Sequence, residues 1–193
     1  MKDTPAISAE KIIEEASKLF FKNGYRNTSM KEIALQLNVT HPAIYYYFKS
    51  KDEILETILK NVLNRAETYL SKILSLKQPA HEKFHMIVEQ HTLAILDNKI
   101  EMGIFFEEQK NLPGSITQET VKRINQYYQT ITGVYREAMD QGYFANIDPP
   151  VAVQLILGLC NWTYKWFSPK GKYNKEQISQ FVSALLKNGY FNE

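Results

Sequence analysis

SMKEIALQLNVTHPAIYYYFKSK, residues 29–51, is the stretch that decides the fold of this chain. Ser29 followed by Glu32 is a capping-box pattern, so a helix is predicted to begin at Ser29. Asn38 tolerates left-handed backbone geometry and predicts a tight turn. Thr40 then predicts a second helix start, because threonine side chains cap helices. Two short helices joined by a tight turn are the arrangement of a helix-turn-helix DNA-binding motif.

The second of these helices, residues 41–49, carries more polar aromatic groups than a small core can bury. Ile44 and Phe48 supply an inward face, but three consecutive tyrosines cannot all point inward. Threonine, histidine and alanine in a first turn suit base edges, while tyrosine and lysine suit phosphates. A packing hairpin with a solvated aromatic face is the alternative. The residues predicted to contact DNA are Thr28, Ser29, Lys31, Thr40, His41, Pro42, Ala43, Tyr45, Tyr46, Tyr47, Lys49 and Lys51.

The segment from Ile12 to Leu55 resembles the DNA-binding domain of TetR-family transcriptional regulators. Two positions depart from the family pattern: many relatives have glycine in place of Pro42 and histidine in place of Tyr47. The first departure is expected to stiffen the start of the recognition helix, and the second leaves one phosphate contact open. The resemblance is carried by Gly24-Tyr25, by residues 28–34 (TSMKEIA) and by residues 39–51 (VTHPAIYYYFKSK).

Length and charge fit a small DNA-binding head and a larger body. The chain has 193 residues, of which 44% are hydrophobic, enough to bury a sizeable core. Its net charge is only +2, yet residues 1–51 hold eight Lys and Arg against five acids. A basic excess beside the motif is what binding to the phosphate backbone requires. The predicted domains are residues 1–52, a helix-turn-helix domain, and residues 53–193, a ligand-binding and dimerisation domain.

Hydrophobic periodicity predicts an all-α fold of about nine helices. The single cysteine, Cys160, excludes an internal disulfide and fits a reducing compartment. The sequence contains no signal peptide and no run of 18 uncharged apolar residues, so the protein is expected to be cytoplasmic. The predicted helices cover residues 8–23, 29–37, 41–49, 51–76, 80–97, 102–109, 115–141, 151–167 and 175–188.

The last two predicted helices carry apolar stripes that need a partner surface. A second copy of the chain is the economical partner, because two-fold symmetry matches a palindromic DNA site. The resemblance implies the same, since the last two helices in this family usually form a four-helix dimer interface. The alternative is that the stripes only close the monomer's own core. The residues predicted at the interface are Leu155, Leu159, Ile178, Phe181, Val182, Leu185 and Leu186.

The body contains more aromatic surface than a helical core of its size needs, and buried Tyr and Trp require polar partners. A cavity lined by them would hold an apolar effector, and the resemblance implies such a site. Residues 161–172 (NWTYKWFSPKGK) also resemble a signature in a subset of the family linked to fatty-acid and sterol catabolism, some of whose members sense acyl-CoA thioesters. Plain core packing and a solvated basic loop are the alternatives. The predicted ligand-binding residues are Phe105, Phe106, Tyr128, Tyr135, Asn161, Trp162, Lys165 and Trp166, with Lys170 and Lys172 as further candidates for CoA phosphates.

Other classes of protein find less support in the sequence. His81, His85 and Glu89 have a spacing that suits a metal, but without a fourth ligand nearby they are interpreted as a solvated face, and no metal or cofactor is predicted. No nucleophile lies beside a base and no glycine-rich phosphate loop is present, so an enzyme is not expected. The sequence therefore predicts a repressor that binds a palindromic operator as a dimer and is released by a small, largely apolar effector, with an acyl-CoA as one candidate. A helical carrier of an apolar ligand that does not bind DNA is the alternative.

Overall fold

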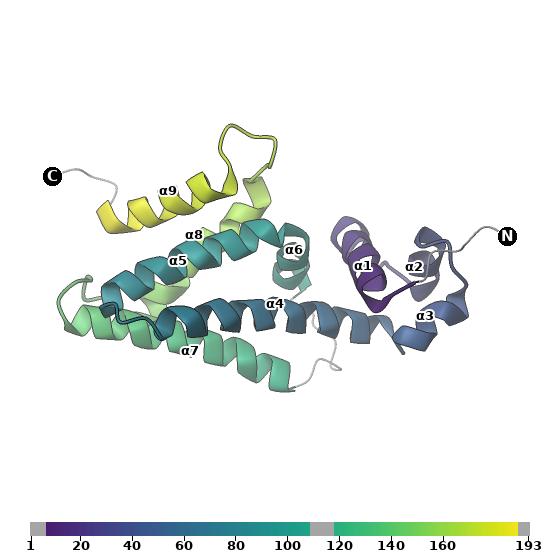
Figure 1. Cartoon of the computed structure of the whole chain (residues 1–193), viewed down its shortest axis with the longest axis horizontal. Coiled ribbons are helices and arrows are strands. Elements are labelled where there is room, and N and C mark those ends of the chain that lie inside the picture. The colour runs from purple at the N-terminus through teal and green to yellow at the C-terminus, as the bar shows by residue number, and fades with distance from the viewer. Residues whose placement is uncertain (1–6, 109–117, 189–193) are drawn as a thin grey trace. The chain divides into compact units, whose positions relative to one another are not determined.

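The computed structural model describes residues 7–108 and 118–188, and all regular secondary structure in these ranges is α-helical (Figure 1). This confirms the predicted all-α class of about nine helices. The helix end predicted at residue 109 and the start predicted at residue 115 lie outside the described residues. No described helix is both long enough and apolar enough to cross a membrane. The helices are α1 (Ala9–Asn23), α2 (Met30–Gln36), α3 (His41–Tyr47), α4 (Lys51–Leu74), α5 (Ala80–Asp97), α6 (Lys99–Glu108), α7 (Gln118–Asp140), α8 (Pro149–Trp166) and α9 (Lys175–Asn188).

The chain divides into two compact units. Unit 1 takes its residues from Met1–Val62 and Ile100–Thr120, and unit 2 from Leu63–Lys99 and Val121–Glu193. Helices α4 and α7 contribute residues to both units. The functional domains predicted on either side of residue 52 stay a prediction.

In unit 1, local interactions set several of the helix boundaries that the sequence predicts; Thr40 precedes α3 as predicted, but its side chain makes no capping hydrogen bond. The backbone amide of Glu32 donates to Ser29 Oγ at 3.2 Å, and the Ser29 amide donates to Glu32 Oε2 at 2.7 Å, which completes the predicted capping box. Gly24 ends α1 with a φ of +84°, a left-handed value that favours glycine. Asn38, with a φ of +54°, makes the turn between α2 and α3.

The core of unit 1 joins the first three helices to the first part of α4 and to α6. Ile12, Ile33, Ile44 and Ile54 are fully buried in it. Ile104 of α6 belongs to the same cluster. At the neighbouring Gly103, a Cβ atom would lie 2.3 Å from the ring of Phe21, so this glycine permits the close approach of α6 to α1.

In unit 2, α5 packs against both α8 and α9 (Figure 1). The fully buried side chains on α5 include Phe84, Ile87 and Ile95. Leu157 and Cys160 of α8 are also fully buried, which agrees with the interpretation of Cys160 as a small core residue. Leu96 of α5 forms a separate apolar cluster with Phe167 and Ile178, which ties the ends of α8 and α9 to the unit.

Candidate functional site

The surface around α3 in unit 1 presents most of the residues predicted to contact DNA. Tyr46 is 84% exposed and Tyr45 is 46% exposed, whereas Ile44, on the inward face of α3, is fully buried. The ring of Tyr45 meets the ring of His41 edge to face at 4.9 Å, so the two side chains form one aromatic surface. The exposed members of the predicted set are Ser29, Lys31, Thr40, His41, Pro42, Tyr45, Tyr46 and Lys49, and Ala43 is half-buried.

Three other residues of the predicted set have polar groups bonded within unit 1. Thr28 is buried, and its hydroxyl donates to the carbonyl of Gly24 at 3.0 Å. The hydroxyl of Tyr47 donates to the carbonyl of Ile7 at 2.7 Å, which fastens the start of the described chain to α3. The ammonium of Lys51 donates to the carbonyls of the loop before α2, Tyr25 at 2.8 Å and Thr28 at 2.9 Å.

Lys51 therefore holds the loop that supports α2. Its ammonium also donates to the carbonyl of Arg26 at 3.2 Å and lies 4.5 Å from the centre of the Tyr25 ring. The Tyr25 hydroxyl in turn donates to Asp52 in the first turn of α4. These bonds fix the loop against α4 and so position the helix-turn-helix.

Replacing Lys51 by methionine is expected to destabilise the protein, because three backbone carbonyls lose a charged donor. Lys51→Met retains most of the apolar side chain, and the free energy of unfolding should fall by about 2 kcal/mol. Urea unfolding of the full chain measures this change. Lys49→Met is the matched control, because Lys49 is exposed and its side chain makes no ion pair with another described residue. An equal loss in both variants would contradict the supporting role of Lys51.

A hydrogen-bonded network of polar side chains crosses the interior of unit 2. His91 of α5 lies at its centre and is 7% exposed. Its Nδ1 lies 2.7 Å from the hydroxyl of Tyr127 on α7, and its Nε2 lies 2.9 Å from Asn161 Oδ1 on α8. The hydroxyl of Tyr69 on α4 bonds to the Tyr127 hydroxyl and lies 3.2 Å from His91 Nδ1. Asn161 also hydrogen-bonds Tyr128 on α7, so four helices contribute to the network.

Burial keeps this network uncharged. Desolvation lowers the pKa of His91 to about 4 and raises the pKa values of Tyr69, Tyr127 and Tyr128. Each of these groups is neutral at physiological pH, and each has the polar partner that a buried polar group requires. The network can therefore exchange hydrogen bonds with a neutral carbonyl or hydroxyl group of a ligand, whereas a carboxylate would have no counter-ion there.

The predicted ligand-binding residues occupy different parts of the chain. Tyr128 and Asn161 meet in the network, and Tyr128 also lines a groove of about 360 Å³ between α7 and α8. Tyr135 packs away from it, with its ring 5.4 Å from that of Phe84. Phe105 packs against the core of unit 1 and, with Phe106, belongs to that unit. Trp162, Lys165 and Trp166 are exposed on α8.

His91, Tyr69 and Tyr127 were absent from the predicted ligand-binding set. The signal that indicates such a residue is a polar side chain within an apolar stripe: His91 shares the inward face of its helix with Phe84, Val88 and Ile95. A histidine at such a position needs hydrogen-bond partners from other helices. Which helices supply them does not follow from periodicity.

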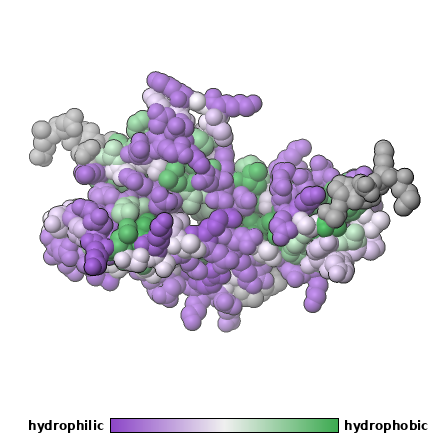
Figure 2. Space-filling model, viewed as in Figure 1, coloured by the Kyte–Doolittle hydropathy of each residue, from purple (hydrophilic) through white to green (hydrophobic). Residues whose placement is uncertain are grey.

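Exposed large apolar side chains form a stripe along α8, and two more lie on α9. Leu155 is 67% exposed and Trp162 62% exposed, and Gly158 between them leaves open space where a side chain would be. In the view of Figure 2, apolar residues in green interrupt the hydrophilic surface over α9. The exposed members are Val151, Leu155, Leu159, Trp162 and Trp166 of α8 and Phe181 and Leu185 of α9.

The other residues predicted at the dimer interface are less accessible. Ile178 and Val182 are buried in unit 2, and Leu186 is half-buried. The predicted stripe on α9 thus has an inward edge and an outward edge. Only the outward edge, Phe181 and Leu185, is open to a partner.

The histidines near the start of α5 do not assemble a metal site. His81 stacks on Tyr143 with ring centres 3.7 Å apart, and His85 meets the ring of Phe144 edge to face. Among the described residues, no three His, Cys, Asp or Glu side chains are grouped as metal ligands would be.

Two family models match this chain. A model described as bacterial regulatory proteins of the tetR family matches residues 12–58, which include α2 and α3. A model described as a tetracyclin repressor-like C-terminal domain matches residues 77–190. Together they cover the helix-turn-helix and most of unit 2.

Relatives and solved structures agree with these matches over nearly the whole chain. The fatty acid metabolism regulator protein of Bacillus subtilis (strain 168) is 27% identical over 186 residues, which are 94% of this chain and 95% of the relative. A crystal structure of a TetR/AcrR-family transcriptional regulator from Thermobifida fusca YX-ER1 is 33% identical, with a TM-score of 0.73 and coverage of 95% and 98%. AibR in complex with isovaleryl coenzyme A and operator DNA is 27% identical, with a TM-score of 0.82 and coverage of 92% and 97%.

The Bacillus subtilis and Thermobifida fusca proteins are named as regulators and not as enzymes, as the sequence predicted. The helix-turn-helix at α2 and α3 is the DNA-binding element common to the first family model and to this chain. This chain belongs to the TetR family of DNA-binding transcriptional regulators.

Proposed function

We propose that this protein is a cytoplasmic repressor that binds a two-fold symmetric operator as a homodimer and is released by a small, largely apolar effector. The observation that carries the proposal is the capped helix-turn-helix with an exposed second helix. Ile44 anchors α3 in the core, and His41, Tyr45 and Tyr46 remain exposed. An anchored helix with open polar side chains is suited to enter a major groove.

In the proposed complex, the start of α3 reads bases and the residues around it hold phosphates. Thr40, His41 and Ala43 lie at the helix start, where side chains reach base edges. Tyr45, Tyr46, Lys49, Ser29 and Lys31 surround them and supply hydroxyl and ammonium donors for the backbone. Thr28, Tyr47 and Lys51 act by positioning these elements, since their polar groups are bonded within unit 1.

The homodimer is proposed to form through the exposed stripe of α8 and the two exposed apolar residues of α9. An uncovered row of large apolar side chains is unfavourable in water and marks an association surface. Gly158 allows a partner helix to approach closely. Two copies of α3 related by a two-fold axis would then occupy successive major grooves, roughly 34 to 36 Å apart.

The proposed effector is an acyl compound, with acyl-CoA thioesters as the first class to test. Support comes from relatives: the solved AibR complex contains isovaleryl coenzyme A, and the Bacillus subtilis relative is named for fatty acid metabolism. Because α4 has residues in both units and follows α3 directly in the chain, it is the proposed element through which a change in unit 2 would reach unit 1. The coupling required is typically ~1 to 3 kcal/mol, and DNA must weaken effector binding by the same factor.

Selection of binding sites from random duplex DNA tests the proposal, followed by titration of the best site with acyl-CoAs of several chain lengths. A two-fold symmetric site released by one thioester is the expected result. A symmetric site that no thioester affects would remove the effector class but keep the DNA-binding regulator. Recovery of a single half-site would remove the dimer.

Tyr45→Ala is expected to weaken binding to the selected site by roughly tenfold, the effect of losing one good DNA contact. The free energy of unfolding should not change, because the Tyr45 side chain is exposed and its ring contacts only His41 among the described aromatic residues. Fluorescence anisotropy with labelled operator measures the affinity. Tyr143→Ala, which removes an exposed tyrosine of unit 2, is the control. Equal affinities for Tyr45→Ala and the wild type would remove Tyr45 from the contact surface.

A further inference from the structure

A surface groove of about 530 Å³ lies between α4 and α5 in unit 2. Its volume is within the range of small-molecule sites, roughly 300 to 1,000 Å³. Along α4 it extends over ten residues, from Asn64 to Ile73, which at 1.5 Å per residue is roughly 15 Å. The lining residues are Asn64, Arg65, Thr68, Tyr69, Lys72, Ile73 and Leu76 of α4 and the segment after it, with Met86 and Gln90 of α5.

The groove has a positive charge that no lining carboxylate balances. Arg65 and Lys72 lie two helical turns apart on the same face of α4 and are exposed. Neither side chain makes an ion pair with another residue in the described ranges. All lining side chains other than these two are uncharged.

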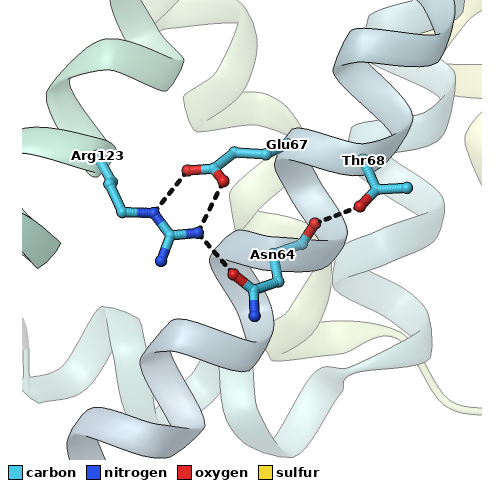
Figure 3. Close-up of polar contacts among 4 residues, drawn as sticks. All are labelled: Asn64, Glu67, Thr68 and Arg123. Atoms are coloured by element: carbon cyan, nitrogen blue, oxygen red, sulfur yellow. Dashed lines mark hydrogen bonds and ion pairs between the residues drawn. The ribbon is translucent and has the colours of Figure 1, made fainter.

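Glu67, the one carboxylate in the second half of α4 (residues 63–74), forms an ion pair with a residue of α7. Arg123 of α7 donates from Nε to Glu67 Oε1 at 2.8 Å and from Nη2 to Glu67 Oε2 at 2.7 Å (Figure 3). The same guanidinium donates to Asn64 Oδ1 at 2.7 Å, which leaves the amide nitrogen of Asn64 as its remaining polar group. Because Glu67 is neutralised by Arg123, it does not offset the charges of Arg65 and Lys72.

The remaining wall of the groove is apolar. Ile73 is buried, Leu76 is 36% exposed and Met86 is half-buried, so they form a hydrophobic surface next to Lys72. A ligand with an anionic head group at Arg65 and Lys72 and an alkyl chain over the apolar wall would match both parts of the groove. Opposite charge together with a continuous apolar wall is the complement of an amphiphilic anion.

We propose that this groove binds a single-chain amphiphilic anion, with its phosphate or carboxylate head between Arg65 and Lys72 and its alkyl chain on Ile73, Leu76 and Met86. This inference rests on the effector response proposed above and supplies the chemistry of the effector and its site. The ligand is a soluble small molecule, and a lipid bilayer is the competing source of the same head group.

Tyr69 connects the groove to the interior of unit 2. Its side chain lines the groove, while its hydroxyl bonds to Tyr127 and lies near His91 in the buried network. A head group held between Arg65 and Lys72 would lie beside Tyr69, which is about one helical turn from each cation, and would therefore act on hydrogen bonds that reach α5, α7 and α8. This gives a ligand in the groove a physical route to the packing of α4.

Isothermal titration calorimetry of the full chain with decyl phosphate, without DNA, tests the site. The double variant Arg65→Glu/Lys72→Glu should bind at least roughly tenfold more weakly than the wild type, because attraction at the head group becomes repulsion. Lys11→Glu/Lys22→Glu makes the same charge change at two exposed lysines of α1 and should bind like the wild type. Circular dichroism confirms that each variant is folded.

Three results would overturn the assignment. Decanol, which lacks the charge, binding as tightly as decyl phosphate would remove the role of the two cations. Loss of binding in Lys170→Glu/Lys172→Glu, which changes the exposed turn after α8, with retention in Arg65→Glu/Lys72→Glu would place the head group on that turn. Tighter binding to phosphatidylglycerol vesicles than to decyl phosphate, lost in Arg65→Glu/Lys72→Glu, would identify a membrane as the ligand.

Operator release separates this inference from the proposed function. Binding of decyl phosphate that requires Arg65 and Lys72 but leaves the operator complex intact would support the groove and contradict its role as the effector site. Release by an acyl-CoA that is unchanged in Arg65→Glu/Lys72→Glu would support the proposed function and overturn the groove as its site.

Discussion

The double variant Leu155→Glu/Leu159→Glu is expected to be monomeric and to bind the operator at least about a hundredfold more weakly than the wild type. Both leucines are exposed on α8, on either side of Gly158. In the proposed dimer they pack against the partner, and four buried carboxylates without counter-ions would prevent association. Each subunit would then bind one half-site, and the gain from joining two half-sites, about 10² to 10⁴ in affinity, would be lost.

Analytical ultracentrifugation and operator binding measure the two effects of this variant. Val121→Glu is the control, because Val121 is an exposed apolar residue of α7 outside the stripe. The control should remain dimeric and bind the operator normally. A double variant that sediments as a dimer would place the interface elsewhere. A monomer that binds the full operator with unchanged affinity would contradict the need for dimerisation.

The helices themselves could be predicted from sequence because their signals are local. Ser29 and Glu32 form the expected capping box, and Asn38 takes the left-handed conformation at the turn. Helix α5 ends at Asp97, as the periodicity predicted. Capping residues and apolar spacing depend only on neighbours in the chain, so they determine where a helix begins and ends.

The direction in which each side chain points was harder to predict. On α9, residues 178 and 182 are buried whereas Phe181 and Leu185 are exposed. These positions lie on one stripe of the helix, and helical spacing does not distinguish its inward edge from its outward edge. Trp162 and Trp166 pose the same problem on α8: both were predicted to bind ligand, and both lie on the exposed stripe.

Polar groups bonded within the fold mark another limit of sequence reasoning. Lys51 and Tyr47 have the chemistry of phosphate contacts, yet their polar atoms bond to backbone carbonyls of residues far away in the chain. Likewise, the network around His91 draws its members from four helices. Such partners depend on tertiary packing, which composition and spacing do not determine.

The buried network makes acid stability a direct test of the interior of unit 2. Burial lowers the pKa of His91 from 6.5 to about 4, so the folded protein resists protonation at a site that protonates readily once unfolded. The stability due to neutral His91 is complete above pH 6.5 and is lost as the pH falls towards about 4. The shift corresponds to a loss of roughly 3 kcal/mol in the free energy of unfolding.

His91→Gln is expected to abolish most of this pH dependence. Glutamine does not titrate, and its amide can accept from a tyrosine hydroxyl and donate to Asn161. Urea unfolding at several pH values between 7 and 4 measures the free energy for each variant, and the difference from the wild type cancels contributions from carboxylates that both proteins share. His41→Gln removes an exposed histidine of α3, retains His91 and should lose stability on acidification as the wild type does.

Burial also lowers the pKa of His85, so a smaller fall in the free energy of unfolding is expected to remain in His91→Gln. Parallel curves for His91→Gln and the wild type would mean that His91 accepts a proton without cost, and the buried neutral network would then have to be abandoned.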